Sequence, residues 1–241
     1  MTSNATWQPA QSQHGMGERL RRLVGPRRAG YLQFLRRRGL QYWPIAGYTQ
    51  IPGWLTEPEA LRLFDLARAI RRPGAVAVEV GSWLGRSSVV LAKGLATARG
   101  ARLYCVDPWN GDGEDYARPE YSAIAERQQL PLHLQFQANM RAFDVEDTVR
   151  PLRGYSADVG RDFAGVIDLL FIDANHEYDS VLADFEIWSP QLAPDGVIAF
   201  HDSDHDGPRA VIDRFVQGHP GWSAGQQVDS LWHARRVSAP A

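Results

Sequence analysis

From residue 73 onward, short continuous runs of apolar residues alternate with stretches of helical pattern. The runs are predicted as strands over residues 76–80, 103–106, 149–153, 167–172 and 197–200. Continuous apolar runs, as opposed to strict alternation, are typical of strands that are covered on both faces, as in a parallel sheet. The pattern therefore predicts an α/β fold with a doubly wound, mostly parallel sheet, in which ligands gather at the carboxyl ends of the strands.

Two further patterns complete this part of the chain. Apolar residues recur at helical spacing between the last two runs and predict one helix over residues 178–192, ended by the turn-forming residues 194–196. Residues 222–237 are predicted as two strands that form a closing hairpin.

Residues 1–72 are predicted as a basic, mostly helical extension, and residues 73–241 as the main domain. The extension holds twelve arginines and four acids, although the whole chain has a formal net charge of −2. A helical pattern over residues 18–38 is interrupted at Gly25-Pro26, and Thr56 with Glu59 forms a capping box for a helix to about residue 70. The basic surface is interpreted as a solvated or self-docked helical face, since no nucleic-acid motif accompanies it. The aromatic residues 42–48 are a candidate acceptor lid, and the extension is a candidate contact in a homo-oligomer.

Composition restricts the compartment. The single cysteine, Cys105, cannot form an intramolecular disulfide and fits a reducing environment. No run of about 18 apolar residues is present, so no membrane span is predicted. We expect a cytoplasmic protein.

A glycine-containing loop follows the first predicted strand. Gly81 permits a tight turn and Gly85 allows the next helix to start close by. A dinucleotide fingerprint has a small residue where this chain has Trp83, which argues against a pyrophosphate over the loop. Glu79 adds an acid that suits an ammonium group.

The ends of the next strands carry candidates for binding a nucleoside. Asp107, about 26 residues after Gly81, is placed to hydrogen-bond the hydroxyls of a ribose. Trp109 is a candidate to stack on adenine, with a core tryptophan as the alternative. Ser156 follows the third strand, where an adenine edge would be read.

The fourth and fifth strands end in acids and histidines. Asp173 follows residues 167–172 and His176 comes three residues later, while His201 and Asp202 follow residues 197–200. A carboxylate at the mouth of a parallel sheet suits a hard metal ion, and an imidazole nearby suits a general base. Each acid also has a structural alternative, as a helix N-cap for Asp173 and as a solvated loop residue for Asp202.

These motifs together resemble class I S-adenosylmethionine-dependent methyltransferases. The resemblance rests on Glu79-x-Gly81-x-x-x-Gly85-x-Ser87, Asp107-Pro108-Trp109, Asp173-x-x-His176 and the segment 196–202, and it covers roughly residues 73–215. Within that class the chain is similar to the macrocin-type sugar O-methyltransferases and the cephalosporin-hydroxylase-like proteins. The resemblance implies a seven-stranded Rossmann-like sheet.

The resemblance also implies a role for each matching residue. Glu79, Gly81, Ser82, Gly85 and Ser87 match the loop that holds the methionine part of S-adenosylmethionine, and Asp107 matches the ribose-binding acid. Asp173, which also borders the cofactor, and Asp202 match the acids that bind Mg²⁺ in metal-dependent members, and His176 matches the general base. Macrocin-type enzymes have Glu-Asp where this chain has His201-Asp202, so the third metal ligand is open among His201, Ser203 and Asp204.

The expected function is Mg²⁺-dependent methyl transfer to a hydroxyl of a sugar, oligosaccharide or glycosylated metabolite. A cephalosporin-hydroxylase-like protein would instead bind iron at His176, His201 and Asp202. Its activity would require dioxygen and iron, whereas the methyltransferase would require S-adenosylmethionine and magnesium. A non-catalytic S-adenosylmethionine-binding scaffold would use the basic extension, and it would tolerate the loss of His176.

Overall fold

A seven-stranded sheet in the order β3-β2-β1-β4-β5-β7-β6 organises the protein. The computed structural model describes residues 28–111 and 118–237. Strands β1 to β5 run parallel, and β7 pairs antiparallel with both β5 and β6. The strands are β1 (Val76–Val80), β2 (Arg102–Asp107), β3 (Val149–Arg153), β4 (Ile167–Ile172), β5 (Leu192–Phe200), β6 (Gln226–Val228) and β7 (Leu231–Arg235).

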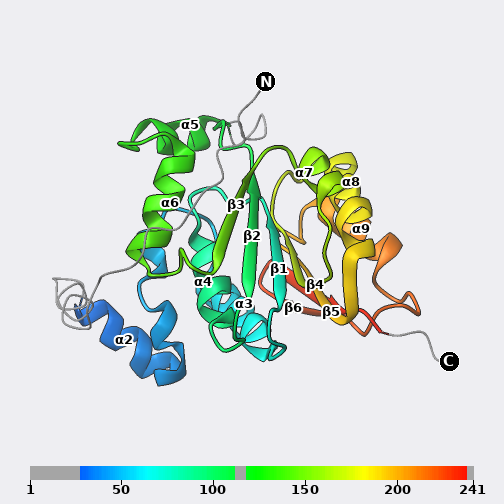
Figure 1. The fold of residues 1–241 in the computed structure, drawn as a ribbon, viewed down its shortest axis with the longest axis horizontal. Coiled ribbons are helices and arrows are strands. Elements are labelled where there is room, and N and C mark those ends of the chain that lie inside the picture. Colours follow the sequence, from blue (N-terminus) through cyan, green and yellow to red (C-terminus); the bar gives the residue numbers. More distant parts are fainter. Residues whose placement is uncertain (1–27, 112–117, 238–241) are drawn as a thin grey trace.

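Helices cover both faces of this sheet, as Figure 1 shows. On one side lie α2 (Arg28–Arg38), α3 (Glu57–Ala69), α4 (Arg86–Leu95) and α6 (Leu132–Ala142), and on the other lie α7 (Ser156–Asp162), α8 (Tyr178–Trp188) and α9 (Asp206–Phe215). The remaining elements are α5 (Arg118–Glu126) and the 3-10 turns η1 (Leu40–Ile45), η2 (Tyr48–Gln50) and η3 (Ser189–Gln191). The predicted doubly wound sheet, with its closing hairpin, is confirmed.

Neighbouring strand residues point to opposite faces and so build two cores. Ala77 of β1 and Leu169 of β4 belong to the core beneath α3 and α4, whereas Val78 and Leu170 belong to the core beneath α8 and α9. Because each face must be apolar, the strand sequences have no polar alternation.

Helix α3 packs directly on the sheet domain. Its N-cap Thr56 forms the predicted capping box with Glu59. At the other end of the contact, a Cβ on Gly94 of α4 would press against Ala67 and the backbone of Phe64, so the glycine allows the two helices a close approach. Residues 57–69 therefore share one core with the strands.

The prediction that one helix continues to residue 192 is wrong. Helix α8 ends at Trp188, since Pro190 has no N–H to donate and its ring excludes a further helical turn. Leu192 instead begins β5, and residues 194–196 form an irregularity within that strand, where the register with β4 shifts.

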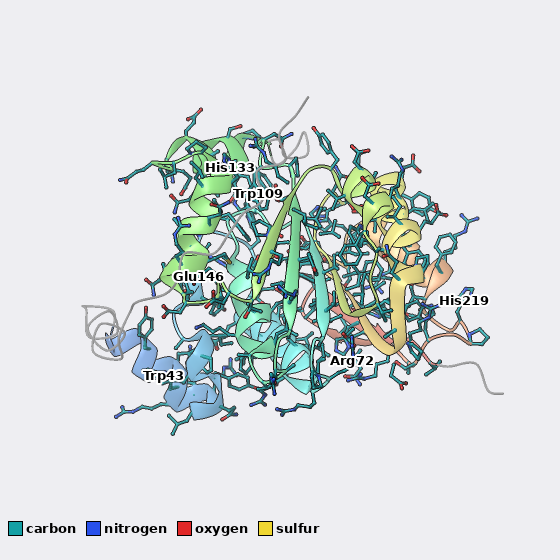
Figure 2. The ribbon with its side chains drawn as sticks, in the orientation of Figure 1. Trp43, Arg72, Trp109, His133, Glu146 and His219 are labelled. Carbon is teal, nitrogen blue, oxygen red and sulfur yellow. The ribbon has the colours of Figure 1, made fainter. Side chains whose placement is uncertain are left out.

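The described part of the N-terminal extension contains α2 and the aromatic segment 42–48. The second half of the predicted helical segment is α2, and its first part, before residue 28, lies outside the described residues. Figure 2 shows Trp43, from the aromatic segment 42–48, at the outer edge beside α2, and its side chain is exposed. Among the described residues, no helix is both long and apolar enough to cross a bilayer.

Candidate active site

The loop after β1 is shaped by the end of β4. Gly81 has φ +87°, and a Cβ there would overlap the backbone carbonyl of Asp173. Only glycine satisfies both conditions, so Gly81 fixes the approach of the two strand ends. Gly85 (φ +91°) is required for a different reason, because a Cβ would collide with Met140 and Phe136 of α6.

Glu79 lies beneath this loop and is fully buried. Ser88 donates a hydrogen bond to one of its oxygens. Burial raises the pKa of Glu79 to about 7, against the lowering effect of the hydroxyls of Ser87, Ser88 and Ser82. Its side chain lines neither of the two cavities described below, and its predicted contact with an ammonium group stays a prediction.

Asp107 ends β2 and organises the neighbouring loops. Its carboxylate accepts hydrogen bonds from the backbone N–H groups of Trp83 (2.8 Å) and Trp109 (2.6 Å). Burial raises its pKa, and these backbone donors oppose the rise. Each carboxylate oxygen has a second lone pair, so Asp107 can still accept from a ligand hydroxyl.

Trp109 occupies the core, which is the alternative that the sequence left open. Its side chain is buried, its indole N–H donates to the backbone oxygen of Trp83 (2.7 Å), and its ring packs against Phe136. Figure 2 shows it inside the layer between α6 and the sheet. Trp109 lines neither cavity, and its burial favours the core alternative, while stacking on a bound base stays a prediction.

A cavity of about 460 Å³, here the larger cavity, opens at the carboxyl ends of β1, β2 and β3. It is lined by Asp107, Ser156 and Asp184, with Gly81 and Asp173 at one end. The Ser156 hydroxyl accepts from the indole N–H of Trp188 (2.8 Å). Burial raises the pKa of Asp184 to about 6, partly offset by Ser156.

A second cavity of about 240 Å³, here the smaller cavity, lies at the ends of β1, β4 and β5. Three aromatic rings form one wall: Tyr121 lies 4.6 Å from Trp54 and 4.9 Å from Trp83 between ring centroids. The opposite wall is polar and contains His176 and Asp202. Ser82 and Ser87, predicted for the cofactor loop, line this cavity and not the larger one.

The two cavities share four lining residues, Gly81, Trp83, Tyr121 and Asp173. A group bound in one cavity therefore meets a group bound in the other at the end of β1 and β4.

The predicted acids and histidines come together in the smaller cavity. His201 Nδ1 lies 3.0 Å from Asp173 Oδ1 and 3.1 Å from Asp202 Oδ2, and His176 Nε2 lies 2.9 Å from the same oxygen of Asp202. Asp202 has φ +46°, a left-handed conformation that costs about 1–2 kcal/mol in a residue with a Cβ and that is common at functional sites.

Glu59 of α3 completes the cluster and was not predicted as a site residue. Its Oε2 lies 3.1 Å from His201 Nε2, and its Oε1 accepts from the backbone N–H (2.8 Å) and hydroxyl (2.7 Å) of Ser230. The capping box already accounted for an acid at this position, so the sequence carried no signal of the second role. Trp54, Tyr121 and Asp184 were missed as well, since no motif contains them.

These contacts shift the pKa values of the residues in the cluster. Burial alone would lower the pKa of His201, but the charge of Asp173 and hydrogen bonds to Asp173, Asp202 and Glu59 raise it far above its ordinary value. Burial opposes ionisation of Asp202 and Glu59, yet hydrogen bonds from the histidines lower the pKa of Asp202 strongly, and contacts with His201, Ser230 and Thr56 lower that of Glu59 to about 2. Burial raises the pKa of Asp173, against the lowering effect of His201 and His176. Asp202 and Glu59 therefore place ionised carboxylates beside the His201 imidazole.

A seven-stranded sheet of this order, with two cavities meeting at the strand ends, is a Rossmann-like architecture. Residues 78–203, just over half of the chain, match a family described as "Methyltransferase domain". The chain belongs to this family. A curated relative, "Uncharacterized protein y4gI" of Sinorhizobium fredii (strain NBRC 101917 / NGR234), is 29% identical over 136 residues, which are 53% of this chain and 13% of that protein.

Solved structures share the fold at low sequence identity. Rv0187 from MTB matches with a TM-score of 0.58 and 19% identity, covering 93% of this chain and 99% of its own. TomG from Streptomyces achromogenes matches with a TM-score of 0.58 and 16% identity, covering 87% and 96%. An O-methyltransferase from Bacillus cereus matches with a TM-score of 0.57 and 17% identity, covering 87% and 97%. The predicted Rossmann-like methyltransferase fold is confirmed.

Proposed function

We propose that this methyltransferase transfers the methyl group of S-adenosylmethionine to a hydroxyl of a sugar or glycosylated metabolite. The meeting of the two cavities at Gly81 and Asp173 carries the proposal. One cavity suits a nucleoside cofactor, the other contains a histidine paired with a carboxylate, and a transferred group has to pass between them.

The larger cavity fits S-adenosylmethionine. Its volume of about 460 Å³ lies within the range of small-molecule sites. Asp107 is available to the ribose hydroxyls, while Ser156 and Asp184 offer polar atoms to an adenine edge. The solved structures of the Bacillus cereus enzyme and TomG are complexes with SAH and SAM, respectively, which supports the same cofactor here. When bound, this cofactor supplies a methyl group on a sulfonium.

The smaller cavity suits an uncharged ring that carries hydroxyls. The faces of Trp54, Trp83 and Tyr121 offer an apolar wall, against which one face of a sugar ring can pack. Arg86 also lines the cavity, but its guanidinium donates to the backbone oxygens of Ile51 (2.7 Å) and Leu55 (3.4 Å). The lining acids Glu120, Asp173 and Asp202 outnumber the lining cations Arg86 and His201, so the cavity disfavours an acceptor that carries phosphate or carboxylate.

His176 is the proposed general base. The transfer forms an oxygen–carbon bond, breaks a sulfur–carbon bond and releases the hydroxyl proton, which His176 accepts. Asp202 stays ionised and lies 2.9 Å from His176 Nε2, so it orients the imidazole and stabilises its protonated form.

The resemblance implies Mg²⁺ at Asp173, Asp202 and His201, and one ligand atom from each lies within 4.8 Å of the others, as is also true of Asp202, Asp204 and His205. Such an ion would make the acceptor hydroxyl more acidic. The fit is poor, because both nitrogens of His201 face carboxylates and therefore carry protons, and because one oxygen of each aspartate accepts from His201. We assign no step to a metal.

The test is methyl transfer from labelled S-adenosylmethionine to a panel of neutral saccharides. We expect His176→Ala to reduce the rate by about 10²–10⁴-fold, the typical contribution of a general base. The control is His219→Ala, since His219 is exposed at the far side of α9 (Figure 2). Activity retained in His176→Ala would refute the assignment of His176 as the base. A folded protein that binds the cofactor but methylates no saccharide would refute the proposed acceptor class.

A further inference from the structure

Three carboxylates from separate parts of the chain surround the imidazole of His201. Glu59 comes from α3, Asp173 from the end of β4 and Asp202 from the end of β5. The imidazole is 3% exposed and Glu59 is fully buried, so water does little to screen these charges. Both ring nitrogens lie within 3.1 Å of a carboxylate oxygen.

This geometry fixes the charge on the ring. Beside an ionised carboxylate, a nitrogen without a proton would place its lone pair against an oxygen lone pair, which is repulsive, so each nitrogen that faces one has to donate. Carboxylates buried this closely also need a cation beside them to stay ionised. His201 lies within 3.1 Å of both Asp173 and Asp202, so its side chain can supply this charge to both.

We infer that the side chain of His201 takes the place of a divalent cation in this methyltransferase, holding Asp173 and Asp202 as a fixed internal positive charge so that no metal is required. A metal bound to these aspartates would face the imidazolium at close range. It would also have to displace the contacts of Asp173 Oδ1 and Asp202 Oδ2 with Nδ1. The other Asp202 oxygen, Oδ1, lies 3.4 Å from the Ser230 hydroxyl.

Glu59 is the positioning residue for this charge. Its Oε1 is held by Ser230 and its Oε2 by the backbone N–H of Thr56 (2.8 Å), so the carboxylate cannot rotate away from His201 Nε2. Because Nε2–H donates to Glu59 Oε2, the ring is oriented with Nδ1–H toward the two aspartates. In this way α3 of the N-terminal extension controls the charge at the strand ends.

The first experiment measures metal binding without any substrate. Mn²⁺ is titrated into the wild-type protein and into the double variant Glu59→Gln/His201→Glu, which restores a Glu-Asp pair after β5 and removes the charge of Glu59. We expect a wild-type Kd weaker than about 1 mM and at least ~10-fold tighter binding by the variant, since three carboxylates then offer oxygens to a hard cation. Wild-type binding tighter than about 1 mM overturns the inference, and so does a folded variant with no gain. Should the variant not fold, the wild-type Kd alone decides.

The second experiment rests on the proposed function and measures methyl transfer with EDTA and with added Mg²⁺. We expect the wild-type rate to be unchanged by either, and loss of activity in EDTA that Mg²⁺ restores would overturn the inference. Failure to methylate any acceptor would count against the proposed function alone, because the Mn²⁺ titration needs no acceptor.

Discussion

Removal of the Glu59 side chain should destabilise the protein far more than its position in the first turn of a helix would suggest. Glu59 is fully buried and accepts hydrogen bonds from the Thr56 N–H, the Ser230 N–H and the Ser230 hydroxyl, besides its contact with His201. Loss of a capping interaction costs about 1 kcal/mol. Each buried donor left without a partner costs about 1–3 kcal/mol.

Loss of the contact between Glu59 and His201 lowers the free energy of unfolding further, but by less than the complete loss of a buried ion pair would. Breaking a buried pair typically costs about 3–5 kcal/mol. His201 keeps Asp173 and Asp202 as partners after the substitution, so the lower end of that range applies. Since these contributions overlap, we expect Glu59→Ala to lower the free energy of unfolding by about 4 kcal/mol, a large share of the 5–15 kcal/mol of an ordinary domain.

Urea denaturation at pH 7 measures this difference. The matched control is Glu57→Ala in the same turn of α3. Glu57 pairs with the exposed Arg37 (2.9 Å) and Arg38 (2.6 Å), and such surface pairs contribute about 0–1 kcal/mol. A Glu59→Ala loss no larger than that of Glu57→Ala would refute the reasoning.

The pH dependence gives a second check on the same residue. Contacts in the folded state lower the pKa of Glu59 from 4.5 to about 2. A lowered acid pKa stabilises the fold above pH 4.5, and this contribution is lost as the pH falls toward 2. The shift corresponds to about 3 kcal/mol, so the stability difference between wild type and Glu59→Ala should shrink across this window.

Two further substitutions test the strand-end loops. Burial raises the pKa of Asp184 from 3.8 to about 6, so ionisation of this side chain opposes folding as the pH rises through that range. Asp184→Asn should therefore raise the melting temperature at pH 8 but not at pH 4. An equal shift at both pH values would contradict this cause. Gly81→Ala should lower the free energy of unfolding by more than Gly218→Ala does. Both glycines have positive φ, but only Gly81 faces the backbone of Asp173. Equal losses in urea denaturation would show that backbone strain alone accounts for the effect.

The strands and the acids at their ends were predictable because local pattern determines both. Residues covered on two faces must be apolar, and the residue after each run emerges at the edge where parallel strands end. Asp173 and Asp202 could therefore be placed together from their positions alone, and they are joined through His201 in the structure.

Features that depend on contacts between distant segments were not predictable in this way. The sequence around Trp109 is compatible with stacking on a ligand or packing in the core, and the contact with Phe136 favours the core. The end of α8 was misplaced because Leu192 continues the helical spacing by chance, while its pairing with Ile167 makes it a strand residue.

The segment before residue 73 contributes to the site, although the sequence divides the chain there. Composition changes there, and the family match begins at residue 78, but the chemistry of the site crosses the division. Glu59 contacts His201 across 142 positions of sequence, and Trp54 supplies part of the aromatic wall of the smaller cavity. Ser230 and Thr56 hold the carboxylate of Glu59 on both sides. Water could replace this carboxylate only if the imidazolium became exposed. The segment before β1 thus supplies part of the site as well as part of the core, and the charge state of His201 depends on it.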